Sequence, residues 1–132
     1  MTYAPALAAL GDERFVSLTT FRKTGEAVSN PVWIARDGDA LVVTTPERSG
    51  KVKRLRNSSR VALRPCDRMG RVTEGATPVF ALAEIVTGTG ITDRLNVIFQ
   101  DKYRLEYRIV MFIERLGKQG RKDRAMLRIT SA

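Results

Sequence analysis

Alternating apolar and polar positions predict that most of this chain forms β-strands. Polar turns around Gly25 and at Asp37-Gly38-Asp39 indicate hairpins between the first three strands. Pro31 interrupts the second strand, and because proline cannot donate to a ladder, an edge or bulged position is expected there. The predicted strands are residues 14–20, 27–36, 40–45, 60–65, a run within 77–91 broken by Gly88 and Gly90 as a bulge, and 124–130.

Helical spacing appears in three places between these strands. A short helix is expected over residues 5–10, ended by Gly11. Val52 and Leu55 lie three apart among basic residues, which predicts a short amphipathic helix with Ser49 as its N-cap. Helices are also predicted from Asp93 through Tyr103 and over residues 105–116. The apolar positions of that last segment indicate core or subunit interface: Leu105, Ile109, Phe112, Ile113 and Leu116.

Six strands in mostly antiparallel hairpin order, with one short helix between the third and fourth, suggest a barrel or a sandwich. The 132 residues fit a single domain spanning 1–132, without repeats or low-complexity linkers. A chain this small with one-sided helices often completes its core by dimerising.

The formal net charge of +9 implies an anionic partner: a nucleic acid, a membrane surface, or a phosphorylated or carboxylated small molecule. Residues 48–71 hold nine basic residues and one acid, Asp67. Residues 102–128 also hold nine basic residues but include three acids. The first zone is therefore the better candidate for a site.

The residue types that are missing restrict the chemistry. There is no histidine, the usual general base and the commonest metal ligand. The single cysteine, Cys66, allows no internal disulfide or structural zinc site and is expected to be inert. We therefore assign no catalytic side chain and no metal ligand, and expect an enzyme of this composition to use a cofactor. No apolar run approaches a membrane helix and the N-terminus does not read as a signal peptide, so a cytoplasmic protein is expected.

The segment from Thr44 to Arg56 is the best candidate for a binding site, because it runs from a strand through a turn into a helix start. Backbone N–H groups at a helix N-terminus attract anions, Ser49 adds a hydroxyl and Gly50 allows close approach. Lys51 and Arg54 lie one turn apart on one face. A solvated basic helix without a ligand is the alternative, and the residue types alone leave both open.

The ordered pieces of residues 10–91 resemble a known family. They are the Val-Ser-Asn-Pro-Val-Trp strand, the Asp-Gly-Asp hairpin, the Thr-Thr strand, Ser-Gly-Lys-Val-Lys-Arg-Leu-Arg, and Arg-Val-Ala-Leu. Together they resemble the pyridoxamine 5′-phosphate oxidase-like superfamily, and more closely its actinobacterial branch of deazaflavin (coenzyme F420)-dependent oxidoreductases. The resemblance implies a mainly β fold, a six-stranded antiparallel split β-barrel, in a homodimer with two cofactor sites at the subunit interface.

The resemblance also implies roles for individual residues. Ser49, Lys51, Lys53 and Arg54, with Gly50 between them, would hold the cofactor phosphate. The ring and ribityl region would be lined by Thr44 and Thr45, although both could stand there for their β-propensity alone. The second strand would present surface near the ring from Asn30, Pro31, Val32 and Trp33. Trp33 could equally be a core aromatic.

The function that the resemblance implies is hydride transfer from reduced coenzyme F420 to an electron-poor small-molecule acceptor, with protons coming from water. An FMN-binding flavoprotein and a cofactor carrier are the alternatives within this fold. The substrate-binding Arg/His motif of the oxidase subgroup is not recognisable near the C-terminus, so vitamin B6 oxidation is not expected. A nucleic-acid-binding β-barrel is less favoured, because aromatics make up only 7% and are not interleaved with the basic helix.

The second basic zone allows two interpretations. Tyr103, Arg104, Tyr107 and Arg108 could lie over the polyglutamate tail of the deazaflavin, or could form a solvated helix face. We favour the solvated face.

Overall fold

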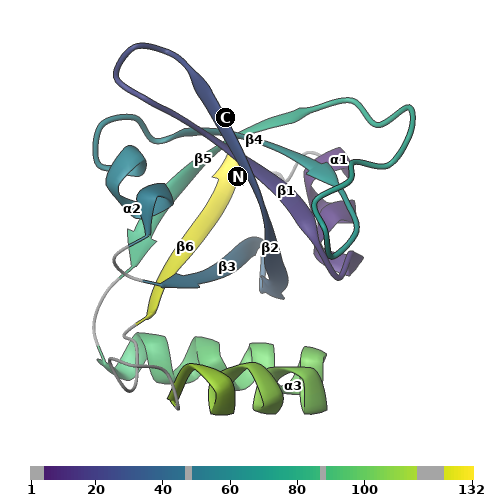
Figure 1. Ribbon diagram of the computed structural model, residues 1–132, viewed down its shortest axis with the longest axis vertical. Coiled ribbons are helices and arrows are strands. Elements are labelled where there is room, and N and C mark those ends of the chain that lie inside the picture. The colour runs from purple at the N-terminus through teal and green to yellow at the C-terminus, as the bar shows by residue number, and fades with distance from the viewer. Residues whose placement is uncertain (1–4, 47–48, 87–88, 116–123) are drawn as a thin grey trace.

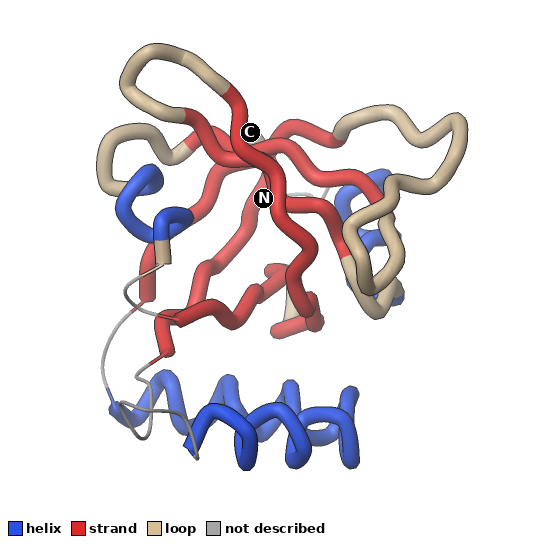
Figure 2. Tube along the Cα trace, in the orientation of Figure 1, coloured by secondary structure: helices blue, strands red, loops and turns tan. Residues whose placement is uncertain are grey.

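The fold is a closed antiparallel barrel of six strands, accompanied by short helices and one longer helical segment (Figures 1 and 2). The computed structural model describes residues 5–46, 49–86, 89–115 and 124–132. The strands are β1 (Val16–Phe21), β2 (Ala27–Asp37), β3 (Ala40–Pro46), β4 (Arg60–Pro65), β5 (Val79–Val86) and β6 (Arg124–Ser131). The helices are α1 (Pro5–Ala9), the 3-10 turn η1 (Leu10–Asp12), α2 (Gly50–Leu55) and α3 (Thr89–Arg115). The predicted six-stranded antiparallel barrel is confirmed.

The strand order around the barrel is β1-β2-β3-β6-β5-β4, and every neighbouring pair is antiparallel. β2 has different neighbours along its length: it pairs with β1 from Ala27 to Val32, and with β3 from Trp33 to Asp37. Pro31 therefore has a paired strand on one side only, opposite Ser17. The expected edge position of this proline is confirmed. On the side without a strand there is no ladder hydrogen bond that its missing N–H could remove.

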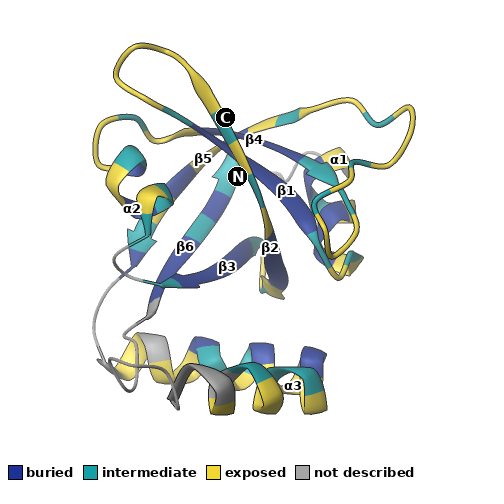
Figure 3. Cartoon of the chain, in the orientation of Figure 1, coloured by how far each residue is buried: buried dark blue, intermediate teal, exposed yellow. Residues whose placement is uncertain are grey.

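Apolar side chains from all six strands fill the barrel, because alternate residues of each strand point inward. α1 and η1 contribute Leu7 and Leu10, and α2 contributes Leu55. A second apolar cluster lies between the outside of the barrel and α3, and joins Trp33, Ala35, Val42 and Met126 to Leu95, Phe99 and Tyr103. Figure 3 shows the corresponding pattern on α3, with buried residues toward the barrel and exposed residues away from it.

α3 is interrupted at Arg104, whose φ of 45° and ψ of −114° are not helical. The chain reverses direction there, so the two halves of α3 form a hairpin beside the barrel (Figure 1). The two separately predicted helices meet at this break, as expected. The predicted β-run to residue 91 was wrong at its end, because Thr89, Gly90 and Ile91 already form the first turn of α3. Gly88 lies outside the described residues. No described helix has both the length and the apolar character that a membrane span requires.

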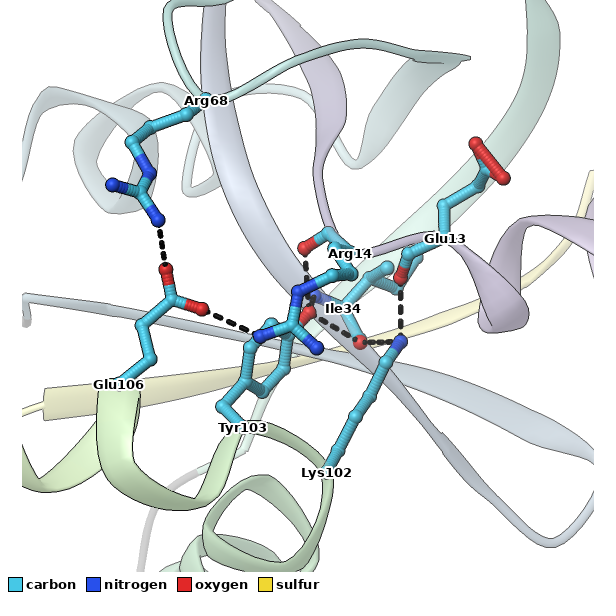
Figure 4. A network of polar contacts seen from close by, with 7 residues as sticks. All are labelled: Glu13, Arg14, Ile34, Arg68, Lys102, Tyr103 and Glu106. Atoms are coloured by element: carbon cyan, nitrogen blue, oxygen red, sulfur yellow. Dashed lines mark hydrogen bonds and ion pairs between the residues drawn. The ribbon is translucent and has the colours of Figure 1, made fainter.

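Two adjacent side chains of α3, Lys102 and Tyr103, form hydrogen bonds to the barrel just beyond the point where β2 stops pairing with β1 (Figure 4). The Tyr103 hydroxyl accepts a hydrogen bond from the Ile34 N–H at 3.0 Å and donates to the Arg14 carbonyl at 2.6 Å. The Lys102 ammonium donates to the carbonyls of Gly11, Glu13 and Ile34. These side chains thereby satisfy backbone groups of Ile34 that the departing strand β1 no longer pairs.

Replacing Tyr103 by phenylalanine tests this attachment. The ring would still pack, but the buried N–H of Ile34 and the carbonyl of Arg14 would lose their partner. Because an unsatisfied buried group costs about 1–3 kcal/mol, we expect the free energy of unfolding to fall by that amount in urea titrations. An unchanged unfolding midpoint would show that the hydroxyl contributes nothing to the docking of α3.

Candidate functional site

A cleft opens where β2 and β3 separate. Their pairing ends at Trp33 and Thr44, so Val32 and Pro31 no longer face Thr45 and Pro46 across a ladder. Two prolines at this end of the strands supply no N–H to extend it. The cleft has a volume of about 180 Å³. It is lined by Phe15, Pro31, Val32, Trp33, Thr44, Thr45, Pro46, Lys51 and Val110.

Trp33 forms one wall of this cleft and is also part of the core. Its ring stacks on Tyr103 with centroids 4.6 Å apart and planes inclined by 15°, and only 9% of the residue is exposed. Tyr107 lies further along the same side, 6.1 Å from the indole. The interpretation of Trp33 as a core aromatic is therefore confirmed, and the same residue also lines the cleft.

The end of β3 adds hydroxyl groups to the cleft lining. Thr44 and Thr45 are both buried, and the Thr45 hydroxyl donates to Ser49 Oγ at 3.3 Å. Ser49 Oγ also accepts a hydrogen bond from the Val52 N–H, so the predicted N-cap of α2 is confirmed. The end of β3 and the start of α2 are thus joined through two hydroxyl groups.

The basic residues of α2 separate in space. Lys51 lines the cleft, whereas Lys53 is exposed and lies outside the cleft lining. Arg54 also lies outside the lining: its Nε donates to Thr20 Oγ1 at 2.6 Å, and a Cβ at Gly50 would come within 2.7 Å of its guanidinium. Gly50 therefore allows Arg54 to lie across the first turn of α2. Burial, and secondarily the charge of Arg22, lower the pKa of Arg54.

Six of the eleven predicted site residues meet in the cleft: Pro31, Val32, Trp33, Thr44, Thr45 and Lys51. Five are not among the residues that line it: Asn30, Ser49, Gly50, Lys53 and Arg54. Asn30 pairs with Leu18 in the β1–β2 ladder. The cleft also contains three residues that the sequence did not single out for it, Phe15, Pro46 and Val110. Val110 was not part of the predicted apolar stripe, and it reaches the cleft because the chain reverses at Arg104.

The second basic zone lies elsewhere. Tyr103 is buried in the cluster under α3, which contradicts both the tail-binding and the solvated-face interpretations for that residue. Arg104 and Arg108 are exposed and line a separate hollow with Gln100, Asp101 and Leu105. For these two arginines the solvated face fits the structure.

The predicted apolar stripe on the second half of α3 is not core of the single chain. Leu105 is 69% exposed, Ile109 50% and Phe112 60%. The side chains of Ile113 and Leu116 lie outside the described residues. Three large apolar side chains in water at helical spacing are typical of an interaction surface.

Comparisons with known proteins agree with this fold. A family model described as pyridoxamine 5′-phosphate oxidase matches residues 5–132. The structure is similar to that of an F420 reductase, at 18% identity and a TM-score of 0.62 over 98% of this chain and 95% of that one. The structure is also similar to that of an FAD-binding protein from Mesorhizobium loti, at 17% identity and a TM-score of 0.61. This match covers 97% of this chain and 88% of that one. A third similar structure is that of HutZ, a heme storage protein from Vibrio cholerae, at 11% identity and a TM-score of 0.68. That match covers 100% of this chain and 92% of HutZ. No curated protein matches this chain.

The reactivity of the Cys66 thiol tests the expectation that this cysteine is inert. Burial raises the pKa of its thiol, and the negative charges of Asp67 and Glu13 raise it further. Because the thiolate is the reactive form, Cys66 should react with a thiol reagent more slowly than a small free thiol at neutral pH. The rate should still be rising at a pH where the small thiol has reached its plateau. A plateau at lower pH would contradict the inert assignment.

Proposed function

This chain belongs to the pyridoxamine 5′-phosphate oxidase family, and we propose that it is an oxidoreductase that binds coenzyme F420 in the cleft between β2 and β3 and reduces an electron-poor small molecule. The observation that carries the proposal is the meeting of Trp33, the two threonines and Lys51 in one cleft. These residues come from β2, β3 and α2, and they meet where the pairing of β2 with β3 ends.

The lining matches the parts of a flavin-type cofactor. Trp33, Phe15, Val110 and the two prolines offer apolar surface for a flat ring. The hydroxyls of Thr44 and Thr45 provide hydrogen-bonding groups for the ring edge or the ribityl chain. Lys51 supplies a positive charge for the phosphate, and Arg54, placed across the same turn of α2 with Ser49, Gly50 and Lys53, is proposed to share that role.

The protein's contribution is to bind and orient. Reduced F420, when bound, supplies the hydride. Trp33 is a rigid wall, since Tyr103 holds its far side and is itself hydrogen-bonded to β2. Thr45 is oriented through Ser49. The described residues that line the cleft include no carboxylate, no histidine and no cysteine. We therefore propose that the reaction needs no acid–base side chain and that protons come from water.

FMN is the alternative cofactor, because the same lining suits its ring and phosphate. The F420 reductase and the FAD-binding protein among the similar structures support a flavin-type ligand in general. A carrier protein would use the same residues, and is distinguished by the absence of turnover with any acceptor.

Two features support a homodimer with the site at the interface. The cleft of about 180 Å³ is smaller than the roughly 300–1,000 Å³ of a typical small-molecule site, so one chain forms only part of a pocket. The exposed stripe of Leu105, Ile109 and Phe112 supplies apolar surface that a second copy would cover.

The phosphate contact is tested by Lys51→Ala. A charge-assisted hydrogen bond contributes about 1.5–3 kcal/mol, so affinity for F420 should fall roughly ten- to hundredfold in a fluorescence titration. FMN, measured in parallel, identifies the preferred cofactor. Arg71→Ala, which removes one positive charge from an exposed loop outside the cleft, is the control and should bind normally. Equal losses in both variants would mean that only the overall charge matters, and normal binding by Lys51→Ala would exclude the cleft lysine.

The dimer is tested by light scattering. The wild type should have twice the chain mass of 14.7 kDa at micromolar concentration. Phe112→Glu places a charge in the apolar stripe and should shift the mass toward that of one chain without unfolding the barrel. A wild-type protein of single-chain mass would exclude an interface site.

A further inference from the structure

A second cavity lies at the other end of α2 from Lys51. It has a volume of about 440 Å³, within the range of small-molecule sites. Its walls come from the end of β1, the β1–β2 turn, the loop after α2 and the start of β4. The lining residues are Phe21, Arg22, Lys23, Gly25, Asn57, Ser58 and Arg60, none of which lines the cleft.

The lining is strongly positive. Arg22, Lys23 and Arg60 are cations, and no carboxylate lines the cavity within the part of the chain that the structure describes. Glu26 pairs with Arg22 at 2.9 Å, but the two side chains are 67% and 53% exposed, so this pair is held weakly. The charge of Arg22 also acts on the neighbouring Arg54. Like charges have been brought together here, and a bound anion would relieve their repulsion.

The cavity also has a flat surface. The guanidinium of Arg60 lies 5.1 Å from the centroid of the Phe21 ring, as a cation–π pair. A guanidinium is planar and stacks on aromatic systems, so this pair is suited to a planar ring as ligand. Asn57 and Ser58 add an amide and a hydroxyl to the lining. Gly25, with φ of 91°, leaves open space where a Cβ would be.

We propose that this cavity is a second ligand site, which binds a phosphorylated ring compound of the nucleotide class. Arg22 and Lys23 neutralise the phosphates, and Arg60 stacks on the ring. Asn57 and Ser58 hydrogen-bond to the polar edge of the ring. The site does not depend on the proposed cofactor cleft, because the two have no lining residue in common.

The test is calorimetric titration of the full chain with ATP, with adenosine and tripolyphosphate as its separate parts. ATP should bind one per chain, and each part more weakly than the whole. Lys23→Gln should weaken ATP and tripolyphosphate at least tenfold. Arg60→Lys keeps the charge but removes the planar group, and should weaken ATP while sparing tripolyphosphate. Thermal unfolding of each variant verifies that it is folded.

Two control variants show whether the loss of affinity is specific to this cavity. Arg36→Gln, at an arginine of β2 paired with Asp12, and Arg71→Gln, at an exposed arginine paired with Asp67 in another loop, should both bind ATP normally. The proposal is wrong if ATP shows no saturable binding, or if either control loses as much affinity as Lys23→Gln. It is also wrong if single-stranded oligonucleotides bind more tightly than ATP, with a steep dependence on salt, since the surface would then serve a nucleic acid.

Discussion

The exchange of neighbours along β2 is the constraint on which the rest of this structure depends. Up to Val32 the strand pairs with β1, and from Trp33 it pairs with β3. Each half therefore has one side without a strand. The first half of β2 has no partner on the side facing β3, and the cleft lies in that gap. On the side left by β1, backbone groups of Ile34 need other partners, because a buried unsatisfied N–H or carbonyl is costly.

α3 supplies those partners, and in doing so completes the site. Lys102 and Tyr103 bond to Ile34, and the same tyrosine stacks on Trp33. Burial lowers the pKa of Lys102 to about 8 and raises that of Tyr103 to about 12, so at neutral pH the ammonium is mostly charged and the hydroxyl can still donate. Glu106, just after the break at Arg104, pairs with both Arg14 and Arg68. Trp33, the aromatic side chain in the cleft, is consequently supported by Tyr103 on the side away from the cleft.

The sequence predicted those features that short-range patterns encode. Alternation placed the strands, Ser49 was recognisable as a cap from its position before an amphipathic run, and Pro31 indicated a strand edge. Features that depend on distant contacts were not predictable in this way. Tyr103 looks like a surface residue among arginines until the gap beside Ile34 is known, and Val110 reaches the cleft only because the chain reverses at Arg104. The spacing of Lys51 and Arg54 placed both on one face of α2, but it did not reveal that Arg54 donates to Thr20 and lies outside the cleft lining.

The high positive charge of residues 48–71 is also divided by the fold. Lys51 lines the cleft and Arg60 the second cavity, whereas Arg68 pairs with Glu106 and Arg71 with Asp67. A protein that binds a nucleic-acid backbone along its surface needs cations arranged in a continuous groove with aromatic platforms between them. Here four basic residues that are close in sequence lie in two separate hollows or in two separate ion pairs. This distribution fits the proposal that a chain of net charge +9 binds compact anions such as phosphate groups rather than a nucleic-acid backbone.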